Sequence, residues 1–282
     1  MAPTMPAVSD AWFIPIGFLV GTYGTIIGAG GGFVIVPLLV FLFPGDGPSM
    51  VTAASLAVIF VNATSGTIAY ARMKRVSYRT GMLFAAATIP GALLGSWLTH
   101  FIPRRIFGLV FGGLLVGVAV FLSLTRGRAR KTGTQEPQAQ AGRTLTLVDA
   151  EGRTHTLGYR PVLGVILSFL IGTFSSLVGI GGGLIHVPVL TSLFAFPMHI
   201  ATATSHFILV FTSLAGVVEH IIDHTWPVHL LRDACLAVGV VGGAQLGASL
   251  SRRLPSRWIV VGLAVALGAV GVRLALGAIL QG

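Results

Sequence analysis

Two short stretches of the chain place three consecutive glycines in apolar sequence, where glycine weakens a helix. They read GAGGGFVIVP from Gly28 to Pro37 and GIGGGLIHVP from Gly179 to Pro188. A helix that stops and restarts here leaves backbone N–H groups without intrahelical acceptors, and the helix dipole behind these groups favours an anion. The pattern therefore predicts an anion site, whose glycines are Gly28, Gly30, Gly31, Gly32, Gly179, Gly181, Gly182 and Gly183.

Hydroxyl side chains recur at matched places after the two glycine stretches. The sequence TAAS begins at Thr52 and TATS begins at Thr202. A spacing of three residues puts Ser55 and Ser205 on the same helix face as the threonine before them, and Asn62 lies two turns beyond Ser55. We expect these five side chains to contact the anion. The alternative is that the hydroxyls bond carbonyls of the preceding turn, as Ser and Thr often do in membrane helices.

Ionisable side chains replace apolar ones in the second of the two matched regions. The replacements are His186 for Ile35, His206 for Leu56 and Glu219 for Ala69. Histidine titrates near neutral pH, and its protonated ring attracts anions. We expect His206 to contact the anion or carry a proton, and His186 and Glu219 to take part in proton coupling. The alternative for each histidine is a neutral ring bonded to a backbone carbonyl.

Glu219, His220, Asp223 and His224 also have the i, i+4 spacing of metal ligands. The same pattern is typical of a helix end that meets water, and we predict no metal site and no cofactor. The single cysteine, Cys235, excludes an intramolecular disulfide and a cysteine-based metal cluster.

The composition indicates where all these residues lie. Hydrophobic residues make up 54% of the 282 residues and charged residues only 9%, whereas a soluble domain carries about a quarter charged residues. Long apolar runs that do not alternate predict a multi-pass membrane protein built of helices. The net charge of +10 does not indicate nucleic-acid binding, because the basic residues cluster at the ends of apolar segments.

Eight apolar segments are predicted, at 12–43, 51–71, 80–100, 105–124, 161–196, 201–222, 228–250 and 256–279. A polar stretch between the fourth and fifth is predicted to be a cytoplasmic linker with a small β-hairpin around Glu151. We therefore divide the chain into a first transmembrane repeat, 1–125, the linker, 126–160, and a second transmembrane repeat, 161–282. The first ten residues contain no Lys or Arg, so we expect the first apolar segment to be retained.

The two halves resemble each other in sequence. Residues 21–39 align with 172–190, and the GALLG stretch at Gly91 matches the GAQLG stretch at Gly243. In membrane proteins such duplication is typical of transporters. The spacing of Gly91 and Gly95 favours close helix packing through small residues.

The first segment is too long for one crossing. As a single helix it would span about 48 Å, whereas the hydrocarbon core is about 30 Å thick. The glycines divide it into two pieces that suit a re-entrant pair, although one broken, tilted crossing is the alternative. Pro37 and Pro188 are expected to interrupt the shorter pieces again. The two breaks, one in each half, should meet near the middle of the membrane.

The basic residues favour an inverted arrangement of the halves. If the fifth segment is re-entrant, the basic clusters at 72–79, 126–160 and 252–257 all face the cytoplasm, as basic loops usually do. If it crosses once, the last cluster lies outside. We therefore predict an inverted repeat in the inner (plasma) membrane, with the basic loops and the linker in the cytoplasm.

The sequence resembles the TauE/SafE family, also called the TSUP family. The resemblance rests on the pattern G-x-G-G-G-x-x-x-x-P at Gly28 to Pro37 and at Gly179 to Pro188, with the Thr-Ala-x-Ser and Gly-Ala-x-x-Gly repeats in support. Members of this family are multi-pass permeases, mostly bacterial, associated with sulfite, thiosulfate, sulfoacetate and other sulfur-containing anions. The resemblance implies export or uptake of a small anion and does not select which one.

Together these features predict a secondary transporter for a small inorganic or organosulfur anion, working by alternating access, with no catalytic residues. No acidic residue lies at the centre of an apolar segment, which argues against a cation carrier. The sequence shows no ATP-binding motif, so an ion gradient or the membrane potential should drive transport. A passive anion channel and an integral membrane enzyme are the alternatives. The anion, the direction of transport, the coupling proton or ion, and any homo-oligomer are left open.

Overall fold

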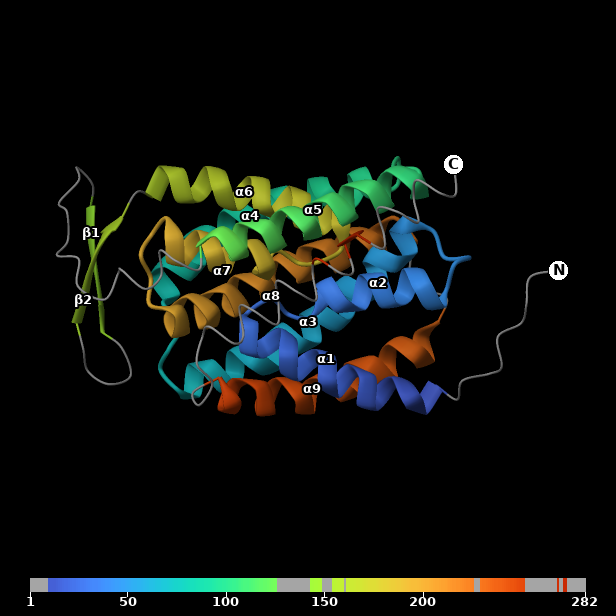
Figure 1. Ribbon diagram of the computed structural model, residues 1–282, viewed down its shortest axis with the longest axis horizontal. Coiled ribbons are helices and arrows are strands. Elements are labelled where there is room, and N and C mark those ends of the chain that lie inside the picture. The colour runs from blue at the N-terminus through green and yellow to red at the C-terminus, as the bar shows by residue number, and fades with distance from the viewer. Residues whose placement is uncertain are drawn as a thin grey trace.

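The computed structural model describes residues 10–125, 143–148, 154–159, 161–225, 229–251, 268 and 271–272. A short 3-10 helix at Asp10–Trp12 leads into the first α-helix. The α-helices are α1 (Phe13–Ile27), α2 (Gly32–Leu42), α3 (Pro48–Arg72), α4 (Tyr78–Thr99), α5 (Arg104–Thr125), α6 (Pro161–Val178), α7 (Gly183–Ser192), α8 (Met198–Ile222) and α9 (Leu230–Leu250). They lie side by side in one elongated bundle (Figure 1).

The lengths and surfaces of these helices fit a lipid bilayer. Within the described residues, six helical stretches are long and apolar enough to cross a membrane, at Asp10–Ile27, Pro48–Arg72, Tyr78–Thr99, Pro161–Val178, Met198–Ile222 and Leu230–Leu250. Large apolar side chains on the outer surface are widely exposed, among them Leu19 at 68%, Ile166 at 53% and Val238 at 63%. Such a surface suits contact with lipid tails rather than water. The prediction of an all-α polytopic membrane protein is confirmed.

Five of the predicted apolar segments correspond closely to single helices. Segments 51–71, 80–100, 105–124, 201–222 and 228–250 become α3, α4, α5, α8 and α9. Most of the last predicted segment, 256–279, lies outside the described residues, although Gly268, Gly271 and Val272 are helical.

The polar stretch between the halves contains two strands. They are β1 (Arg143–Val148) and β2 (Thr154–Tyr159), which pair antiparallel with Arg143 opposite Tyr159. The predicted turn around Glu151 and residues 126–142 lie outside the described part of the chain.

The first and fifth segments are each broken and turn back. The ring of Phe43, which follows α2, lies 6.1 Å from the ring of Phe13 at the start of α1. In the other half, a Cβ added to Gly164 near the start of α6 would lie 3.3 Å from the side chain of Phe194, which follows α7. Both segments therefore fold back as pairs of helices and do not continue in one direction, as the re-entrant alternative expects. That each pair enters and leaves the membrane on one side stays a prediction.

The expectation that Pro37 and Pro188 interrupt the shorter helices is wrong. Each proline lies inside its helix, Pro37 in α2 and Pro188 in α7. A proline removes only one backbone donor, and its fixed φ is close to the helical value. Both helices are packed on neighbouring helices, so the loss of one hydrogen bond does not end them.

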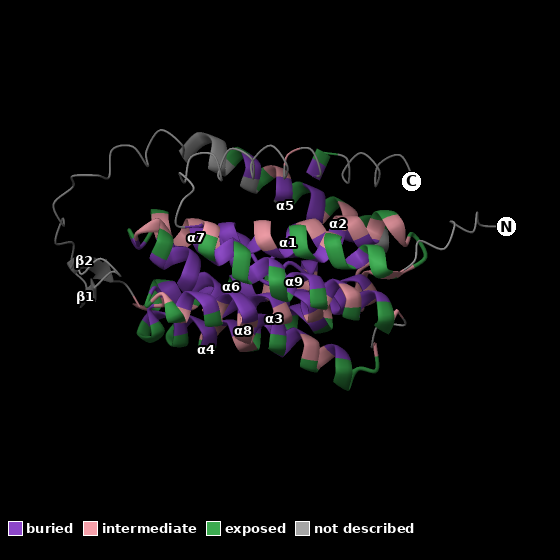
Figure 2. Cartoon of the chain, turned by 90° about the horizontal axis from the view of Figure 1, so that it is seen from below, coloured by how far each residue is buried: buried purple, intermediate pink, exposed green. Residues whose placement is uncertain are grey.

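Helices α3 and α8, one from each half, pack against each other at the centre of the bundle. Buried residues, coloured purple in Figure 2, fill the middle of the bundle, and most of α8 is buried. Helix α1 packs along α9, and α6 packs along α4. If α1 is matched with α6 and α4 with α9, as the sequence alignment suggests, these two contacts are equivalent. Their common origin and their inverted orientation in the membrane stay predictions.

Glycines bring these paired helices into backbone contact. A Cβ added to Gly91 would meet the carbonyl of Phe169 in α6, and one added to Gly95 would meet that of Thr173. In the equivalent pair, a Cβ on Gly243 of α9 would meet the carbonyl of Phe18 in α1. The prediction that Gly91 and Gly95 serve close helix packing is confirmed.

Candidate functional site

The two glycine stretches adopt the same backbone conformation. In the first, Gly28, Gly30 and Gly31 have φ values of 87°, 71° and 85°. In the second, the corresponding values are 77°, 75° and 90° at Gly179, Gly181 and Gly182. Residues with a Cβ rarely adopt this left-handed region, which explains why glycine occupies these positions. Each break therefore has a defined shape that depends on its glycines.

The two breaks touch each other inside the bundle, as the sequence predicts. A Cβ added to Gly32 would lie 2.9 Å from the Cα atom of Ile180. In the reverse direction, a Cβ on Gly183 would lie 2.9 Å from the Cα atom of Ala29. The four helix ends that meet here, those of α1, α2, α6 and α7, form what we call the junction.

Two apolar side chains flank the junction. Ile59 of α3 and Leu209 of α8 occupy matched positions, and both are fully buried. A Cβ on Gly30 would contact both side chains, and a Cβ on Gly181 would lie 2.7 Å from Leu209 and 3.0 Å from Ile59. In this structure the breaks are thus packed closely between α3 and α8.

The serines of the matched hydroxyl pairs join the two halves reciprocally. Ser55 of α3 donates to the carbonyl of Gly179 at 2.7 Å, and Ser205 of α8 donates to the carbonyl of Gly28 at 3.0 Å. The hydroxyl of Ser205 also lies 3.3 Å from the carbonyl oxygen of Gly183. Each serine therefore satisfies a carbonyl of the break in the opposite half.

The threonines of the same pairs behave differently. Thr52 donates to the carbonyl of Ser49 at 2.9 Å, and Thr202 donates to the carbonyl of Met198 at 2.8 Å. These are the bonds to the preceding turn that the alternative interpretation describes. The backbones of both threonines pack against the junction, Thr202 against Gly28 and Thr52 against the equivalent glycine.

The amides at the junction divide into two groups. Those of Gly28, Ala29 and Gly30 donate to the carbonyl of Gly24 at 3.0, 2.9 and 3.2 Å, and so complete the end of α1. The amides that begin α2 and α7 have no acceptor within their own helices, because the first N–H groups of a helix never do. These amides belong to Gly32, Phe33, Gly183 and Leu184.

His206 extends the junction through a buried polar cluster. Its Nε2 lies 3.3 Å from the hydroxyl oxygen of Thr25, and that hydroxyl donates to the side-chain oxygen of Asn62 at 3.3 Å. A Cβ on Gly66 would lie 2.6 Å from the ring, so the glycine makes room for it. The structure brings together two predicted ligands, His206 and Asn62.

Tyr70 completes this cluster. Its ring meets that of His206 edge-on with centroids 5.6 Å apart, and its hydroxyl donates to the carbonyl of Thr25 at 2.7 Å. Sequence reasoning did not select Thr25 or Tyr70. The first could have been found, because Thr25 aligns with Ser176 and both positions therefore carry a hydroxyl. Nothing in the sequence indicates that Tyr70 reaches α1.

Removing the hydroxyl of Tyr70 should destabilise the end of α1. Tyr70→Phe keeps the ring contact with His206 but leaves the buried carbonyl of Thr25 without its donor, which costs about 1–3 kcal/mol. We expect a lower midpoint of thermal unfolding in detergent. Tyr78→Phe is the control, because the Tyr78 side chain is 54% exposed. Equal midpoints for both variants would contradict this assignment.

His186 is buried beside the second break. Its Nδ1 lies 3.0 Å from the carbonyl oxygen of Gly182, so this nitrogen carries the proton. The geometry is that of a neutral ring bonded to a backbone carbonyl, the alternative that the sequence left open. Within the described residues, Nε2 has no hydrogen-bond partner. A role for His186 in proton coupling stays a prediction.

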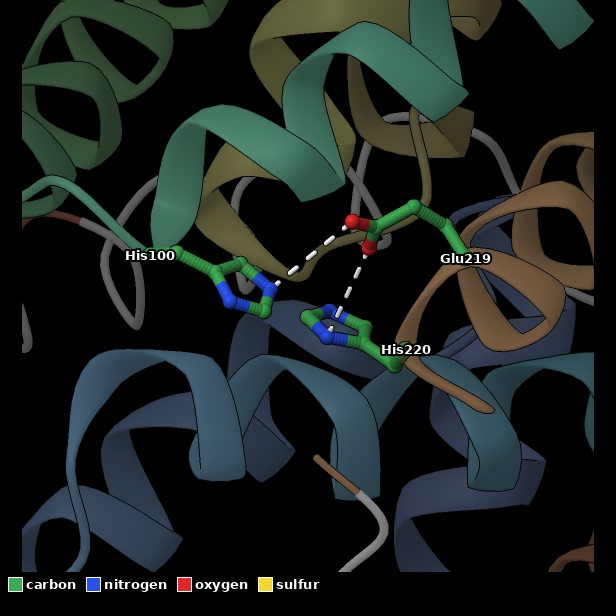
Figure 3. Close-up of side chains that lie close together, drawn as sticks. All are labelled: His100, Glu219 and His220. Atoms are coloured by element: carbon green, nitrogen blue, oxygen red, sulfur yellow. Dashed lines mark ion pairs between the residues drawn. The ribbon is translucent and has the colours of Figure 1, made fainter. Parts of the chain in front are cut away.

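Glu219 lies away from the junction. It is thirteen residues beyond His206 on α8, or about 20 Å along the helix. Its neighbours are His100 and His220 at the end of the bundle (Figure 3). Of the predicted site residues, the structure brings only Thr52 near Glu219 within the described part of the chain: its hydroxyl lies 3.2 Å from the Nε2 of His220, whose Nδ1 lies 3.6 Å from Glu219.

Comparison with known proteins identifies the family. The family described as "Sulfite exporter TauE/SafE" matches residues 13–274, which include both breaks and every helix of the bundle. The chain belongs to the TauE/SafE family. The resemblance seen in the glycine patterns is confirmed, and the family match extends over nearly the whole chain.

Several similar proteins are named as probable membrane transporters. The probable membrane transporter protein YunE of Bacillus subtilis is 33% identical over 267 residues, which cover 93% of this chain and 95% of YunE. A probable membrane transporter protein of Methanocaldococcus jannaschii is 24% identical over 275 residues, with 92% of each chain covered. One of Xylella fastidiosa is 28% identical over 244 residues, 84% of this chain and 83% of its own. No solved structure gives a significant match.

Proposed function

We propose that this TauE/SafE protein is a secondary transporter that carries a small sulfur-containing anion across the membrane. Sulfite, thiosulfate and organosulfonates are the candidates. The family description and the names of the relatives support a membrane transporter. The anion and the mechanism rest on the chemistry of the junction.

The observation that carries the proposal is the polarity of the junction. Two helices end there and two begin, so carbonyl oxygens and amide hydrogens meet in one place. The carbonyls of Thr25, Gly28 and Gly179 accept hydrogen bonds from Tyr70, Ser205 and Ser55. These bonds offset the negative ends of α1 and α6. The amides that begin α2 and α7 have no acceptor within their own helices, and the positive ends of both helix dipoles lie behind them, which favours an anion.

We assign the expected contacts with the anion to this positive side of the junction. Gly31 and Gly182 directly precede α2 and α7, and Gly32 and Gly183 are the first residues of these helices, whereas the amide of Gly28 already bonds within the end of α1. His206 lies next to the junction and adds positive charge when its ring is protonated.

Close packing of the breaks supports a carrier rather than a channel. Ile59 and Leu209 flank the glycines, and the backbone of Ile180 lies against Gly32. An anion can reach the amides only after the breaks or their flanking helices move apart. Movement of one half against the other would open the junction to each side in turn, which is alternating access.

The re-entrant pairs support the proposed orientation in the inner membrane. Because α1–α2 and α6–α7 each return to their starting end, the ends of α3, α5 and α9 lie at the same end of the bundle (Figure 1). The basic clusters at 72–79, 126–160 and 252–257 follow these three helix ends. Placing this end in the cytoplasm satisfies the preference for basic loops there.

Flux measurements test the proposal. Purified protein in lipid vesicles should take up at least one of sulfite, thiosulfate, sulfate or an organosulfonate, supplied as tracers, and should accumulate it when an ion gradient is imposed. Empty vesicles are the control. Movement only down the concentration gradient would indicate a channel, and the absence of flux for every anion in the panel would contradict the proposed substrate class.

A further inference from the structure

Three ionisable side chains converge at the end of the bundle opposite the hairpin strands. His100 directly follows α4, and Glu219 and His220 lie in the last turn of α8. Each residue offers one ligand atom, and these atoms lie within 4.8 Å of one another. Figure 3 shows the carboxylate of Glu219 above both imidazole rings. The rings stack with centroids 5.5 Å apart and an interplanar angle of 21°.

Neighbouring groups determine which nitrogen of each ring carries the proton. The Nδ1 of His100 lies 2.6 Å from the carboxylate of Asp223 and therefore donates to it. The Nε2 of His220 lies 3.2 Å from the hydroxyl oxygen of Thr52. That hydroxyl donates its own proton to the carbonyl of Ser49, so it accepts from His220. In the neutral rings, the lone pairs are on Nε2 of His100 and on Nδ1 of His220.

Both nitrogens that carry a lone pair lie near the carboxylate of Glu219. The Nε2 of His100 is 3.8 Å from Oε1 of Glu219, and the Nδ1 of His220 is 3.6 Å from Oε2. Oε2 is buried and has no hydrogen-bond partner among the described residues. Three electron-pair donors that face one another repel unless a cation lies between them.

Two hydroxyls lie near the cluster, but neither replaces a cation between the three electron-pair donors. The hydroxyl of Ser49 lies 3.4 Å from the Nε2 of His100, which is a long contact. The hydroxyl of Thr225 lies 3.2 Å from the Nδ1 of His220 and also 3.2 Å from its carbonyl oxygen, so its one proton can serve the carbonyl. Neither hydroxyl neutralises the charge of Glu219.

We propose that His100, Glu219 and His220 bind a Zn²⁺ ion. Two imidazole nitrogens and one carboxylate oxygen form a ligand set that zinc commonly has in proteins when the fourth position is held by water. The Nδ1–H of His100 donates to Asp223, and such a bond to a carboxylate is typical of histidines that bind zinc. The bond of His220 to Thr52 orients the second ring in the same way.

The geometry requires only small adjustments. Zinc binds these atoms at about 2.0–2.2 Å, which brings the ligands of a tetrahedral site to about 3.3 Å from one another. The two nitrogen–oxygen separations of 3.8 and 3.6 Å are already close to that value. The ion can enter beside the half-exposed carboxylate of Asp223, whereas His220 closes the inner side. All three ligand atoms lie within 4.8 Å of one another, so side-chain torsion changes that shorten the separations by up to about 1.5 Å complete the site.

Bound zinc would join the halves of the protein. His100 follows α4 of the first half, whereas Glu219 and His220 belong to α8 of the second. The sequence alone could not show this site, because His100 is far from the other two ligands along the chain. The four-residue pattern at 219–224 suggested a different set that included His224, which is exposed and lies outside the cluster.

Metal binding by the purified full-length protein tests the proposal. After treatment with a chelator and dialysis, titration with Zn²⁺ should show one site, measured by calorimetry and by the metal content of the protein after desalting. Co²⁺ in its place should give the visible absorption of a four-coordinate site. Zinc should also raise the midpoint of thermal unfolding, because it binds only the folded chain.

Variants identify the ligands. His100→Ala, Glu219→Gln and His220→Ala should each weaken zinc binding at least about a hundredfold, and Asp223→Asn about ten- to a hundredfold. His224→Ala is the matched control and should bind zinc as the unchanged chain does. The unfolding midpoint without metal shows whether each variant is folded.

Two outcomes would overturn the proposal. One is the absence of a site tighter than about 10 μM in the folded protein, which would leave a proton as the cation in the cluster. The other is unchanged affinity in His100→Ala. The binding assay includes no transport step, so its failure would not affect the proposed function.

Discussion

Replacing Gly31 or Gly182 with leucine is expected to abolish anion transport while the protein still inserts into the membrane. These glycines have φ values of 85° and 90° and directly precede α2 and α7. A side chain in this region costs about 1–2 kcal/mol of backbone strain. A Cβ on Gly31 would also lie 2.7 Å from the side chain of Val20, and one on Gly182 would lie 2.9 Å from the hydroxyl of Ser175.

The expected loss follows from where this strain acts. Overpacking adds about 1–3 kcal/mol, and each 1.4 kcal/mol corresponds to about a factor of ten in an equilibrium. The helix starts that carry the amides would move, and the loss of uptake in vesicles should exceed tenfold. Insertion should persist, because the apolar segments are unchanged.

A glycine in α5 with open space around it provides the control. A Cβ added to Gly113 would meet no atom of the described residues within 4 Å, so Gly113→Leu should transport normally. Membrane fractionation and size-exclusion chromatography establish that each variant is inserted and folded. Normal uptake by both Gly31→Leu and Gly182→Leu would remove the junction from the transport pathway.

Two adjacent glycines of α9 should respond in opposite directions to the same substitution. Gly243→Ala puts a methyl group against the backbone of Phe18, where α1 and α9 are in contact. Backbone atoms cannot move aside as a flexible side chain can, so the helices must separate. We expect a loss of stability of about 1–3 kcal/mol.

Gly242→Ala should be neutral or stabilising. Its Cβ would lie 3.5 Å from the ring of Phe18, an ordinary contact on an exposed face. Alanine is favoured over glycine in a helix by about 0.8–1.0 kcal/mol. Thermal unfolding in detergent compares the two variants directly. A midpoint for Gly243→Ala equal to or above that of Gly242→Ala would contradict the close packing of α1 on α9.

The features that the sequence could predict are those encoded locally. Apolar run length predicted the membrane helices, and the spacing of the glycines predicted where two apolar segments break. The length of segment 12–43 also favoured a re-entrant pair. These predictions succeed because the bilayer constrains helix length and backbone hydrogen bonding strongly. The prediction at Pro37 and Pro188 failed because packing of neighbouring helices outweighs one missing hydrogen bond.

Contacts between residues from distant parts of the chain could not be predicted from the sequence. The sequence indicated that Ser55 and Ser205 belong near the glycines, but not that each serine bonds the carbonyl of the opposite break. Nor could it place Tyr70 on the carbonyl of Thr25, or His100 beside Glu219. These contacts depend on how α1, α3, α4 and α8 cross in space, which periodicity along one segment does not encode.

The reciprocal serine bonds bear on how the molecule can be divided. The linker at 126–160 separates the halves in sequence, yet Ser55 serves Gly179 and Ser205 serves Gly28. A half that was synthesised alone would have an orphaned carbonyl at its break and unpaired glycine faces on its outer helices. The folding unit is therefore the whole chain. Two halves expressed as separate fragments would have to be present together in the membrane to fold.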